Sequence, residues 1–257
     1  MTPAEALEHV WLGRIPYRDT WALQRRLAEL RSRDEIDDVV VLVEHPAVYT
    51  MGRNGSPDHL PFGIDHLTGR GAEYVEVDRG GSVTFHGPGQ LVAYPIVLIA
   101  RAFPFRGHPG LGDVIAHLRA LEEAMITTVA ACGVQARRRP PYTGIWVGGQ
   151  KLAAIGVKLA GGVTTHGAAL NVSTDLDWFS QVIPCGIEGA GVASLQSLGV
   201  EPLPEVSVLG ERLVADLAAL MGREPRPAST RVQAEVAATV AAAVGRDGAK
   251  PVVASSA

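Results

Sequence analysis

The sequence predicts an α+β fold in which mixed, largely antiparallel sheets are flanked by helices. Three observations support this prediction. Stretches with helical periodicity alternate with short apolar runs typical of strands. The strands of the second half are joined by glycine-rich segments, GGQ and AGGVT, which are typical of hairpin turns. Because hairpins join antiparallel strands, the pattern favours a layered α+β fold over a doubly wound one.

The first half of the chain predicts one helix followed by three strands. Residues 19–32 (DTWALQRRLAELRS) have an amphipathic period, with Asp19 or Thr20 as the N-cap. The apolar run VVVLVE predicts a buried strand, YVEV alternates, and Pro95 within the third run suggests a sheet edge or a bulge. These strands are expected at 39–44, 74–77 and 91–99.

The second half predicts two further helices with a group of short strands between them. The helix at 112–131 has Asp113 near its start, and the last helix covers 206–221. The strands between them are expected at 134–138, 144–148, 151–159 and 165–172. Residues 1–222 are therefore predicted to form a single domain. Residues 223–257 are rich in Pro, Arg, Ser and Ala, and we expect a mostly disordered tail with one weak helix at 232–244.

Composition excludes several classes of function. The formal net charge of −4 argues against nucleic acid as a partner. Neither GxGxxG nor GxxxxGK[ST] is present, and the two cysteines, Cys132 and Cys185, do not form a zinc motif or a disulfide framework. No apolar run is long enough for a membrane span, and the N-terminus lacks a signal-peptide pattern. We therefore expect a cytoplasmic protein with reduced thiols.

Two segments draw attention as candidate sites. RGGSVTFHGPGQ (79–90) places glycines beside His86, which either lines a ligand site or is simply hydrogen-bonded within a turn. IPCGIEGAG (183–191) holds Cys185 between a proline and a glycine, as expected for an exposed loop. A cysteine nucleophile needs a base or a cation to supply its thiolate.

Several side chains could activate such a thiol. His86 and His166 are candidates, as is one lysine of KLAAIGVKL, because Lys151 and Lys158 face opposite sides of a regular strand. Lys151 directly follows a Gly-Gly turn, where its long side chain either reaches a neighbouring loop or stays in solvent. The small residues after His166 either leave room for a ligand or allow tight sheet packing.

At this point the sequence resembles a known family. The segments HPAVYTMG (45–52), RGGSVTFHGPGQLVAYPI (79–96), GIWVGGQKLAAIGVKL (144–159), THGAALNV (165–172) and FSQVIPCGIEGAGVASL (179–195) resemble the lipoyl(octanoyl) transferases, in the family's order. The wider fold resembles the catalytic domain of lipoate and biotin protein ligases. Two departures are minor: Phe85 stands where tyrosine is common, and Ala193 where threonine is common.

The resemblance implies an activity and its site. Such enzymes move an octanoyl group from acyl carrier protein to a lysine on the lipoyl domains of 2-oxoacid dehydrogenase E2 subunits or on the glycine-cleavage H protein. The acyl-accepting cysteine corresponds to Cys185 and its activating lysine to Lys151, whereas Lys158 does not match. His166 is a further candidate for orienting the substrate in the pocket. The acyl-binding positions correspond to Arg79, Gly80, Gly81, Ser82, Val83, Thr84, Phe85, His86, Ala154, Ile155, Gly156, Gly167, Ala168 and Ala169.

The implied reaction needs no cofactor, neither ATP nor a metal, because thioester exchange is nearly isoenergetic and amide formation is downhill. Two alternatives stay open: an ATP-dependent lipoate or biotin protein ligase on the same scaffold, and a non-enzymatic acyl-binding protein. Lys151 either stabilises the Cys185 thiolate as a cation or transfers its proton. The second role needs a pKa below the ordinary ~10.4 of lysine.

Overall fold

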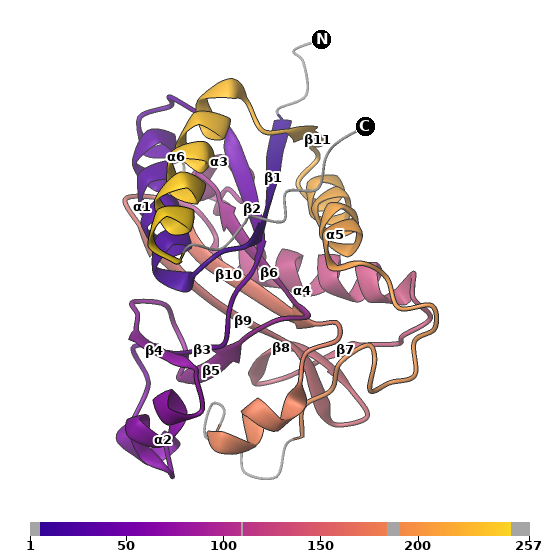
Figure 1. Ribbon diagram of the computed structural model, residues 1–257. Coiled ribbons are helices and arrows are strands. Elements are labelled where there is room, and N and C mark those ends of the chain that lie inside the picture. The colour runs from indigo at the N-terminus through magenta and orange to yellow at the C-terminus, as the bar shows by residue number, and fades with distance from the viewer. Residues whose placement is uncertain (1–5, 109, 184–190, 248–257) are drawn as a thin grey trace.

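The computed structural model describes residues 6–108, 110–183 and 191–247, and a large mixed sheet runs through its centre (Figure 1). This sheet has eight strands. In sheet order the strands are β11 (Glu224–Pro227), β1 (Ala6–Arg14), β2 (Asp38–Glu44), β6 (Gln90–Ile96), β10 (Val163–Asn171), β9 (Gln150–Ala160), β8 (Tyr142–Val147) and β7 (Arg137–Arg139).

Strand direction confirms the predicted fold class. β1 pairs in parallel with β2 and β11, while every other neighbouring pair of this sheet is antiparallel. Both predicted hairpin turns are present. The turn Gly148-Gly149 has φ of 56° and 88°, and Gly161-Gly162 has φ of 57° and 79°. Positive φ at both central residues is the requirement of the tight turn that matches strand twist, and glycine meets it without steric cost.

A second, small sheet lies beside the large one. Its order is β4 (Glu73–Glu76), β3 (Val48–Met51) and β5 (Val83–His86). Part of the glycine-rich segment 79–90 is thus a strand, because VTFH pairs antiparallel with VYTM. The short helices η1 (Pro57–His59) and α2 (Gly63–Gly69) belong to the connection between β3 and β4. A further short helix, η2 (Leu176–Gln181), packs near β5.

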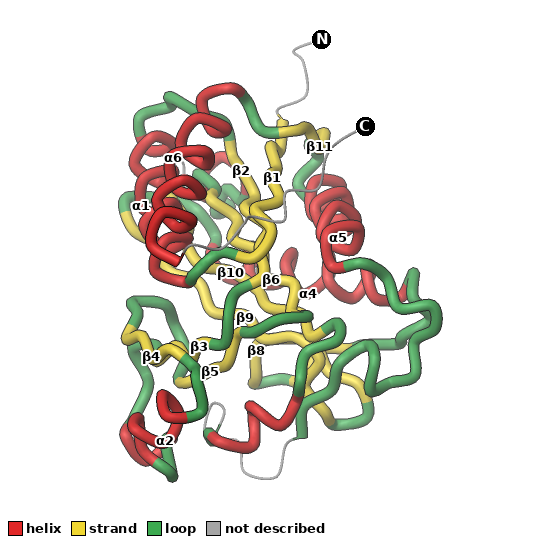
Figure 2. Tube along the Cα trace, in the orientation of Figure 1, coloured by secondary structure: helices red, strands yellow, loops and turns green. Residues whose placement is uncertain are grey.

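Helices cover both faces of the large sheet (Figures 1 and 2). α1 (Tyr17–Ser32) and α6 (Thr230–Asp247) lie against one face, and α4 (Val114–Ala130) and α5 (Val206–Leu220) against the other. α3 (Ile99–Ala102) is a single turn that follows β6. Each face has its own apolar core: Leu42, Leu91 and Met125 belong to one, and Leu27, Val41 and Ile96 to the other. No helix in the described ranges is long and apolar enough to cross a membrane.

Helix starts agree with the sequence in one case and differ in the other. Asp113 caps α4 as predicted, since its Oδ1 accepts a hydrogen bond from Ala116 N at 2.9 Å. The predicted N-cap of the first helix is wrong. α1 begins at Tyr17 with Pro16 at the N-cap, and the Thr20 hydroxyl donates back to the Pro16 carbonyl at 3.3 Å.

Pro95 was predicted to mark a sheet edge or a bulge, and the edge is wrong because β6 is flanked by β2 and β10. Pro95 still pairs with Val40 of β2, but the paired positions between β6 and β10 end at Ala93 and Ala168. Beyond them, the Pro95 carbonyl accepts a hydrogen bond from the Thr164 hydroxyl at 2.8 Å. Proline has no N–H to donate to a neighbouring strand. The sheet accommodates Pro95 by interrupting the pairing of β6 with β10 at this point, and not by placing it on an edge strand.

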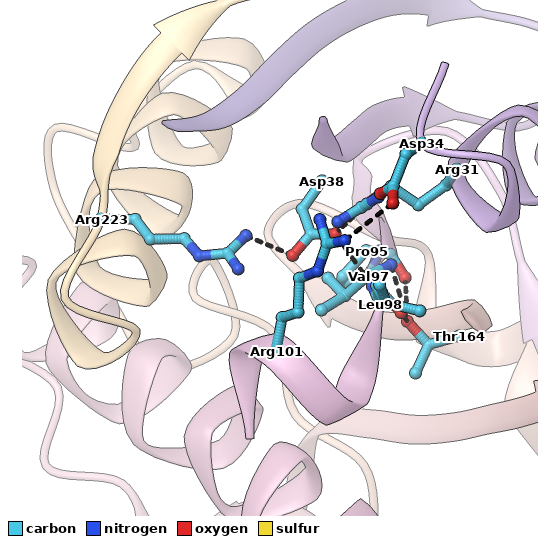
Figure 3. A network of polar contacts seen from close by, with 9 residues as sticks. All are labelled: Arg31, Asp34, Asp38, Pro95, Val97, Leu98, Arg101, Thr164 and Arg223. Atoms are coloured by element: carbon cyan, nitrogen blue, oxygen red, sulfur yellow. Dashed lines mark hydrogen bonds and ion pairs between the residues drawn. The ribbon is translucent and has the colours of Figure 1, made fainter. Parts of the chain in front are cut away.

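The helix predicted at 232–244 is present within α6, but the tail around it is not disordered as far as residue 247. β11 extends the large sheet, and α6 packs against α1, with Val232 fully buried. Arg223 forms an ion pair with the buried carboxylate of Asp38, which also accepts hydrogen bonds from Arg31 Nε at 2.6 Å and Leu98 N at 2.8 Å (Figure 3). The C-terminal segment is therefore tied into the main core. Residues 248–257 lie outside the described part of the chain.

Candidate active site

A cavity of about 520 Å³ lies where the large sheet meets β5 and the starts of α1 and α4. Its size is within the usual range for small-molecule sites. All but one of the acyl-binding positions implied by the sequence line it: Arg79, Gly80, Gly81, Ser82, Val83, Thr84, His86, Ala154, Ile155, Gly156, Gly167, Ala168 and Ala169. Residues far apart in the sequence are thus gathered around one space.

Phe85 is the exception among these positions. Its ring stacks on Trp178, with centroids 5.2 Å apart, and contacts Tyr49 and Phe179 in a separate apolar cluster. Phe85 and His86 are neighbours on β5, so their side chains point to opposite faces. Val83, on the face of Phe85, belongs to the same cluster but also lines the cavity. Phe85 therefore supports the wall from behind, while the next residue, His86, lines the cavity.

Bare main chain forms part of the cavity wall. The N–H of Gly80 donates to the Val157 carbonyl at 3.0 Å, so the glycine-rich segment crosses β9 at close range. A Cβ added to Gly156 would lie 2.9 Å from the Gly80 carbonyl oxygen. Only glycine allows this approach. The guanidinium of Arg79 holds the segment in place by donating to the Thr50 carbonyl at 2.7 Å and to its hydroxyl at 2.8 Å.

His86 is a buried, hydrogen-bonded residue that also lines the cavity. The amide nitrogen of Gln90 donates to the Phe85 carbonyl and to Asn171 Oδ1, so Gln90 Oε1 accepts the proton of His86 Nδ1 at 2.7 Å. The His86 ring stacks on Tyr17 at 5.8 Å between centroids. Burial holds the pKa of His86 well below its ordinary value of 6.5, so the ring is neutral and its Nε2 carries a lone pair.

His166 lies in the same wall, at a residue with φ of 57° where the β10 ladder to β6 has ended. Its main-chain N–H donates to Gln24 Oε1 at 2.7 Å instead of to the sheet. The ring contacts Asp78 and Tyr17, both far away in the sequence. Burial lowers the pKa of His166 to about 4, against the opposing effect of Asp78.

Lys151 lines the cavity from the second position of β9. Its Nζ lies 5.2 Å from the centroid of the Trp146 ring. Gly144 makes room for this side chain, because a Cβ there would be 3.2 Å from Lys151 Cε. Lys158 is placed differently: it forms an ion pair with Asp78 and is not among the residues that line the cavity.

Cys185 lies outside the described residues, but both ends of its segment are fixed at the cavity. On one side, the Ile183 N–H donates to the carbonyl of His59 at 3.0 Å. On the other side, the Lys151 N–H donates to the Gly191 carbonyl at 2.9 Å. His59 and Lys151 both line the cavity, so the segment between Ile183 and Gly191 starts and finishes beside it.

The sequence did not single out several cavity residues: Tyr17, His59, Gln90, Tyr94 and Asn171. The segment Ser56-Pro57-Asp58 before His59 carries a helix-start signal, yet nothing in it points to a cavity. Within the described ranges, no group of three or more His, Cys, Asp or Glu residues is arranged to hold a metal ion.

A known protein family matches most of this chain. The family model of the lipoyl protein ligase A/B catalytic domain matches residues 16–217. The chain belongs to the lipoyl protein ligase A/B catalytic domain family. The resemblance drawn from the sequence motifs is therefore confirmed. β1 lies before the matched residues, and β11 and α6 lie after them.

Curated members of the lipoyl protein ligase A/B family are similar over most of their length. A protein of Rubrobacter xylanophilus named "Octanoyltransferase" is 47% identical over 72% of this chain and 80% of its own. An "Octanoyltransferase" of Chloroflexus aurantiacus is 44% identical over 84% of this chain and 94% of its own. These two proteins share far more of the sequence than the solved structures with the same fold.

Solved structures confirm the predicted fold class. A putative lipoate protein ligase of Thermoplasma acidophilum superposes with a TM-score of 0.68 over 91% of this chain and 93% of that chain. A lipoate-protein ligase A bound with ATP superposes with a TM-score of 0.66 over 93% and 95% of the two chains. Both are only 15% identical to this protein, so the likeness is one of fold.

Proposed function

We propose that this protein is an octanoyltransferase, which moves an octanoyl group from a thioester on acyl carrier protein to a lysine of a lipoyl domain. One observation carries the proposal: Lys151 stands in the wall of a cavity built from glycine main chain and small apolar residues. Such a wall suits an unbranched hydrocarbon chain. The names and the identity of the curated relatives support the same activity.

The chemistry has two acyl-transfer steps, with Cys185 as the nucleophile. In the first step the Cys185 thiolate attacks the thioester carbonyl, a new C–S bond forms, and the carrier thiol leaves with a proton. In the second step the acceptor lysine amine attacks the acyl-enzyme. The amide forms, the amine loses its proton, and Cys185 is regenerated as a thiol. Both steps conserve or release free energy, so neither requires ATP.

Lys151 is the proposed activator of Cys185. Its contacts with the far end of the cysteine segment support this role: besides the Gly191 contact, the Lys151 carbonyl accepts from Ala193 N at 2.9 Å. As an ammonium, Lys151 stabilises the thiolate. As an amine, it takes the thiol proton and later a proton of the incoming amine. Lys158, the other lysine of this strand, forms an ion pair with Asp78 and does not line the cavity.

The cavity wall supplies the binding energy for the acyl chain. An octanoyl group has seven carbons beyond its carbonyl. At about 0.8 kcal/mol per CH₂, their burial contributes roughly 5 kcal/mol before the costs of ordering the chain. The paired positions Ala154 of β9 and Ala169 of β10 face this space with methyl groups, which leaves the slot open.

The proposed partners are octanoyl-acyl carrier protein as donor and, as acceptors, the lipoyl domains of 2-oxoacid dehydrogenase E2 subunits and the glycine-cleavage H protein. The cytoplasm is the proposed location of this reaction. One structural neighbour supports such an acceptor: a bi-partite lipoate protein ligase of Thermoplasma acidophilum, studied with its E2 lipoyl domain, has a TM-score of 0.67 to this chain.

Intact-mass analysis after mixing with octanoyl-acyl carrier protein tests the proposal. We expect one added octanoyl mass without ATP, removed by hydroxylamine and absent in Cys185→Ser. Addition of apo lipoyl domain should then discharge the wild-type acyl-enzyme. An activity strictly dependent on ATP would identify a ligase instead, and octanoate binding that survives Cys185→Ala without any acyl transfer would identify a binding protein. Lys151→Met should form the acyl-enzyme slowly, with Lys158→Met as the matched control.

A further inference from the structure

His59 is a cavity-lining residue that the proposed mechanism has not used. It is the last residue of η1, in the connection between β3 and β4. Its ring Nδ1 lies 3.2 Å from the main-chain nitrogen of Ser56 and 2.5 Å from the hydroxyl of Ser82. The Ser56 hydroxyl in turn accepts from Asp58 N, so His59 and Ser56 cap this short helix reciprocally.

These contacts determine which ring nitrogen of His59 carries the proton. A main-chain N–H can only donate, so Nδ1 must accept from Ser56 and cannot itself be protonated. The Ser82 hydroxyl then also donates to Nδ1. A neutral imidazole with an unprotonated Nδ1 has its proton on Nε2. The cap therefore fixes His59 as a hydrogen-bond donor at the far end of its ring.

The donor is the Nε2–H group of His59, which makes no hydrogen bond to any described residue. The residue is half-buried in the cavity wall. The other cavity histidines differ in this respect. The N–H of His86 is taken by Gln90, and the N–H of His166 by Asp78. Of these three rings, only His59 keeps an N–H for a ligand.

The main chain of His59 also bears on the reaction. Its carbonyl accepts the N–H of Ile183, which stands two residues before Cys185 in the sequence. The same residue thus holds one end of the cysteine segment and lines the cavity. An acyl chain offers a single acceptor, its carbonyl oxygen. We propose that the Nε2–H of His59 donates a hydrogen bond to the carbonyl oxygen of the bound acyl thioester.

This inference rests on the proposed acyl transfer and adds a catalytic residue to it. When the sulfur attacks, the C=O π bond becomes a lone pair on oxygen, and the negative charge on that oxygen strengthens the hydrogen bond. When the carrier thiolate leaves, the carbonyl is restored. His59 keeps its proton throughout. A donor that is already in place favours the tetrahedral intermediate over the bound substrate, so its effect is expected on kcat.

Two conservative variants separate this role from the role of the cap. In His59→Asn, the side-chain oxygen takes the place of Nδ1 and still accepts from Ser56, but the far donor is lost. In His59→Gln, the amide nitrogen reaches the place of Nε2 and supplies a donor. Single-turnover acylation by octanoyl-acyl carrier protein, followed by intact mass, should be slowed about 10²–10³-fold in H59N. The concentration for half-saturation and the Tm should stay close to wild type. H59Q should recover at least ten-fold of the lost rate.

The pair H59Q and H59L gives a second comparison that does not depend on the cap, because both lose the acceptor and only Gln has a donor. H59L is expected to be the slower by at least ten-fold. Acylation of H59N at the wild-type rate, or equal rates for H59Q and H59L, would overturn the inference. If the wild-type protein itself forms no acyl-enzyme on Cys185, the proposed function fails and the role of His59 fails with it. Normal wild-type acylation with unaffected His59 variants removes only this inference.

Discussion

His166 Nε2 lies 2.8 Å from Asp78 Oδ1, and this pair joins β10 to the residue that precedes the glycine-rich segment. The carboxylate can only accept, so His166 carries its proton on Nε2. Its Nδ1 is then the acceptor for the Tyr17 hydroxyl at 3.2 Å. The chain Asp78–His166–Tyr17 thereby locks α1 to the cavity wall with a neutral imidazole in the middle.

Loss of the carboxylate should be felt mainly through this buried ring. We expect Asp78→Ala to lower the free energy of unfolding by about 1–3 kcal/mol, because the His166 N–H, in a side chain only 1% exposed, loses its acceptor. Lys158→Ala is the matched control, since it removes the other partner of Asp78. The side chain of Lys158 is 31% exposed. That variant should cost no more than about 1 kcal/mol. Urea unfolding at pH 7 measures both, and equal losses would contradict a special role for His166.

The length of the acyl chain should depend on two paired alanines. Ala154 and Ala169 are opposite each other on β9 and β10, and both line the cavity. Ala154→Val or Ala169→Val should shift the preference from octanoyl towards hexanoyl carriers. Each CH₂ that no longer fits loses about 0.8 kcal/mol, or roughly four-fold in kcat/KM. Leu159→Ile, at an exposed position of β9, should leave the chain-length profile unchanged. The measurement is kcat/KM across hexanoyl, octanoyl and decanoyl carriers, and an unaltered profile in both valine variants would refute the assignment.

Elements with local signals were predictable from the sequence. The two-glycine hairpins and the α4 cap are set by residues within a few positions of each other. β1 was missed because ALEHVWLGR has no clean alternation and owes its strand form to its neighbours β2 and β11. The C-terminal segment was misjudged for the same reason. Its composition indicates disorder, but burial of Val232 against α1 and the Arg223–Asp38 pair are long-range effects.

The candidate site likewise contains some features that the sequence predicts and others that depend on long-range contacts. The family motifs identified the glycine wall and Lys151, and alternation along β5 distinguishes His86 from Phe85. Tyr17 reaches the cavity only because α1 packs on β10, and it contacts a histidine 149 positions away. His59 becomes a defined donor only through its cap and Ser82. Tertiary placement and proton positions of this kind leave no local pattern in a sequence.

The C-terminal segment (223–247) should contribute to the stability of the fold through Arg223. Asp38 is fully buried, and removal of one cationic partner leaves its charge compensated only by Arg31 and main-chain Leu98 N (Figure 3). We expect Arg223→Ala to lower the free energy of unfolding by about 3 kcal/mol. Arg226→Ala, nearby on β11, removes an exposed pair with Glu224 and should change it by less than about 1 kcal/mol. Chemical denaturation compares the two, and similar small effects would show that the Arg223 pair is not needed.

His117 makes the fold sensitive to acid. It is fully buried in α4 against Phe103, and neither ring nitrogen has a hydrogen-bond partner in the described structure. Burial lowers its pKa from 6.5 to about 4, with Asp38 opposing the shift. Above pH 6.5 both the folded and the unfolded chain hold a neutral ring. Between pH 6.5 and about 4 only the unfolded chain takes up a proton, so stability falls with falling pH.

The size of this effect can be isolated with His117→Leu. At 1.36 kcal/mol per pH unit, His117 should account for about 2 kcal/mol of the stability lost between pH 7 and pH 5. H117L should therefore lose about 2 kcal/mol less than wild type over that range, and at pH 7 it should be at least as stable, since an unsatisfied polar ring is replaced by an apolar side chain. His45 and His166, whose pKa values burial also lowers to about 4, remain and keep part of the acid sensitivity. His108→Gln, at an exposed position, is the control and should follow the wild-type curve. Urea unfolding at pH 7, 6 and 5 gives the dependence of the free energy of unfolding on pH for wild type, H117L and H108Q. Equal pH dependence in H117L and wild type would mean that His117 is protonated in the folded protein as readily as in the unfolded chain.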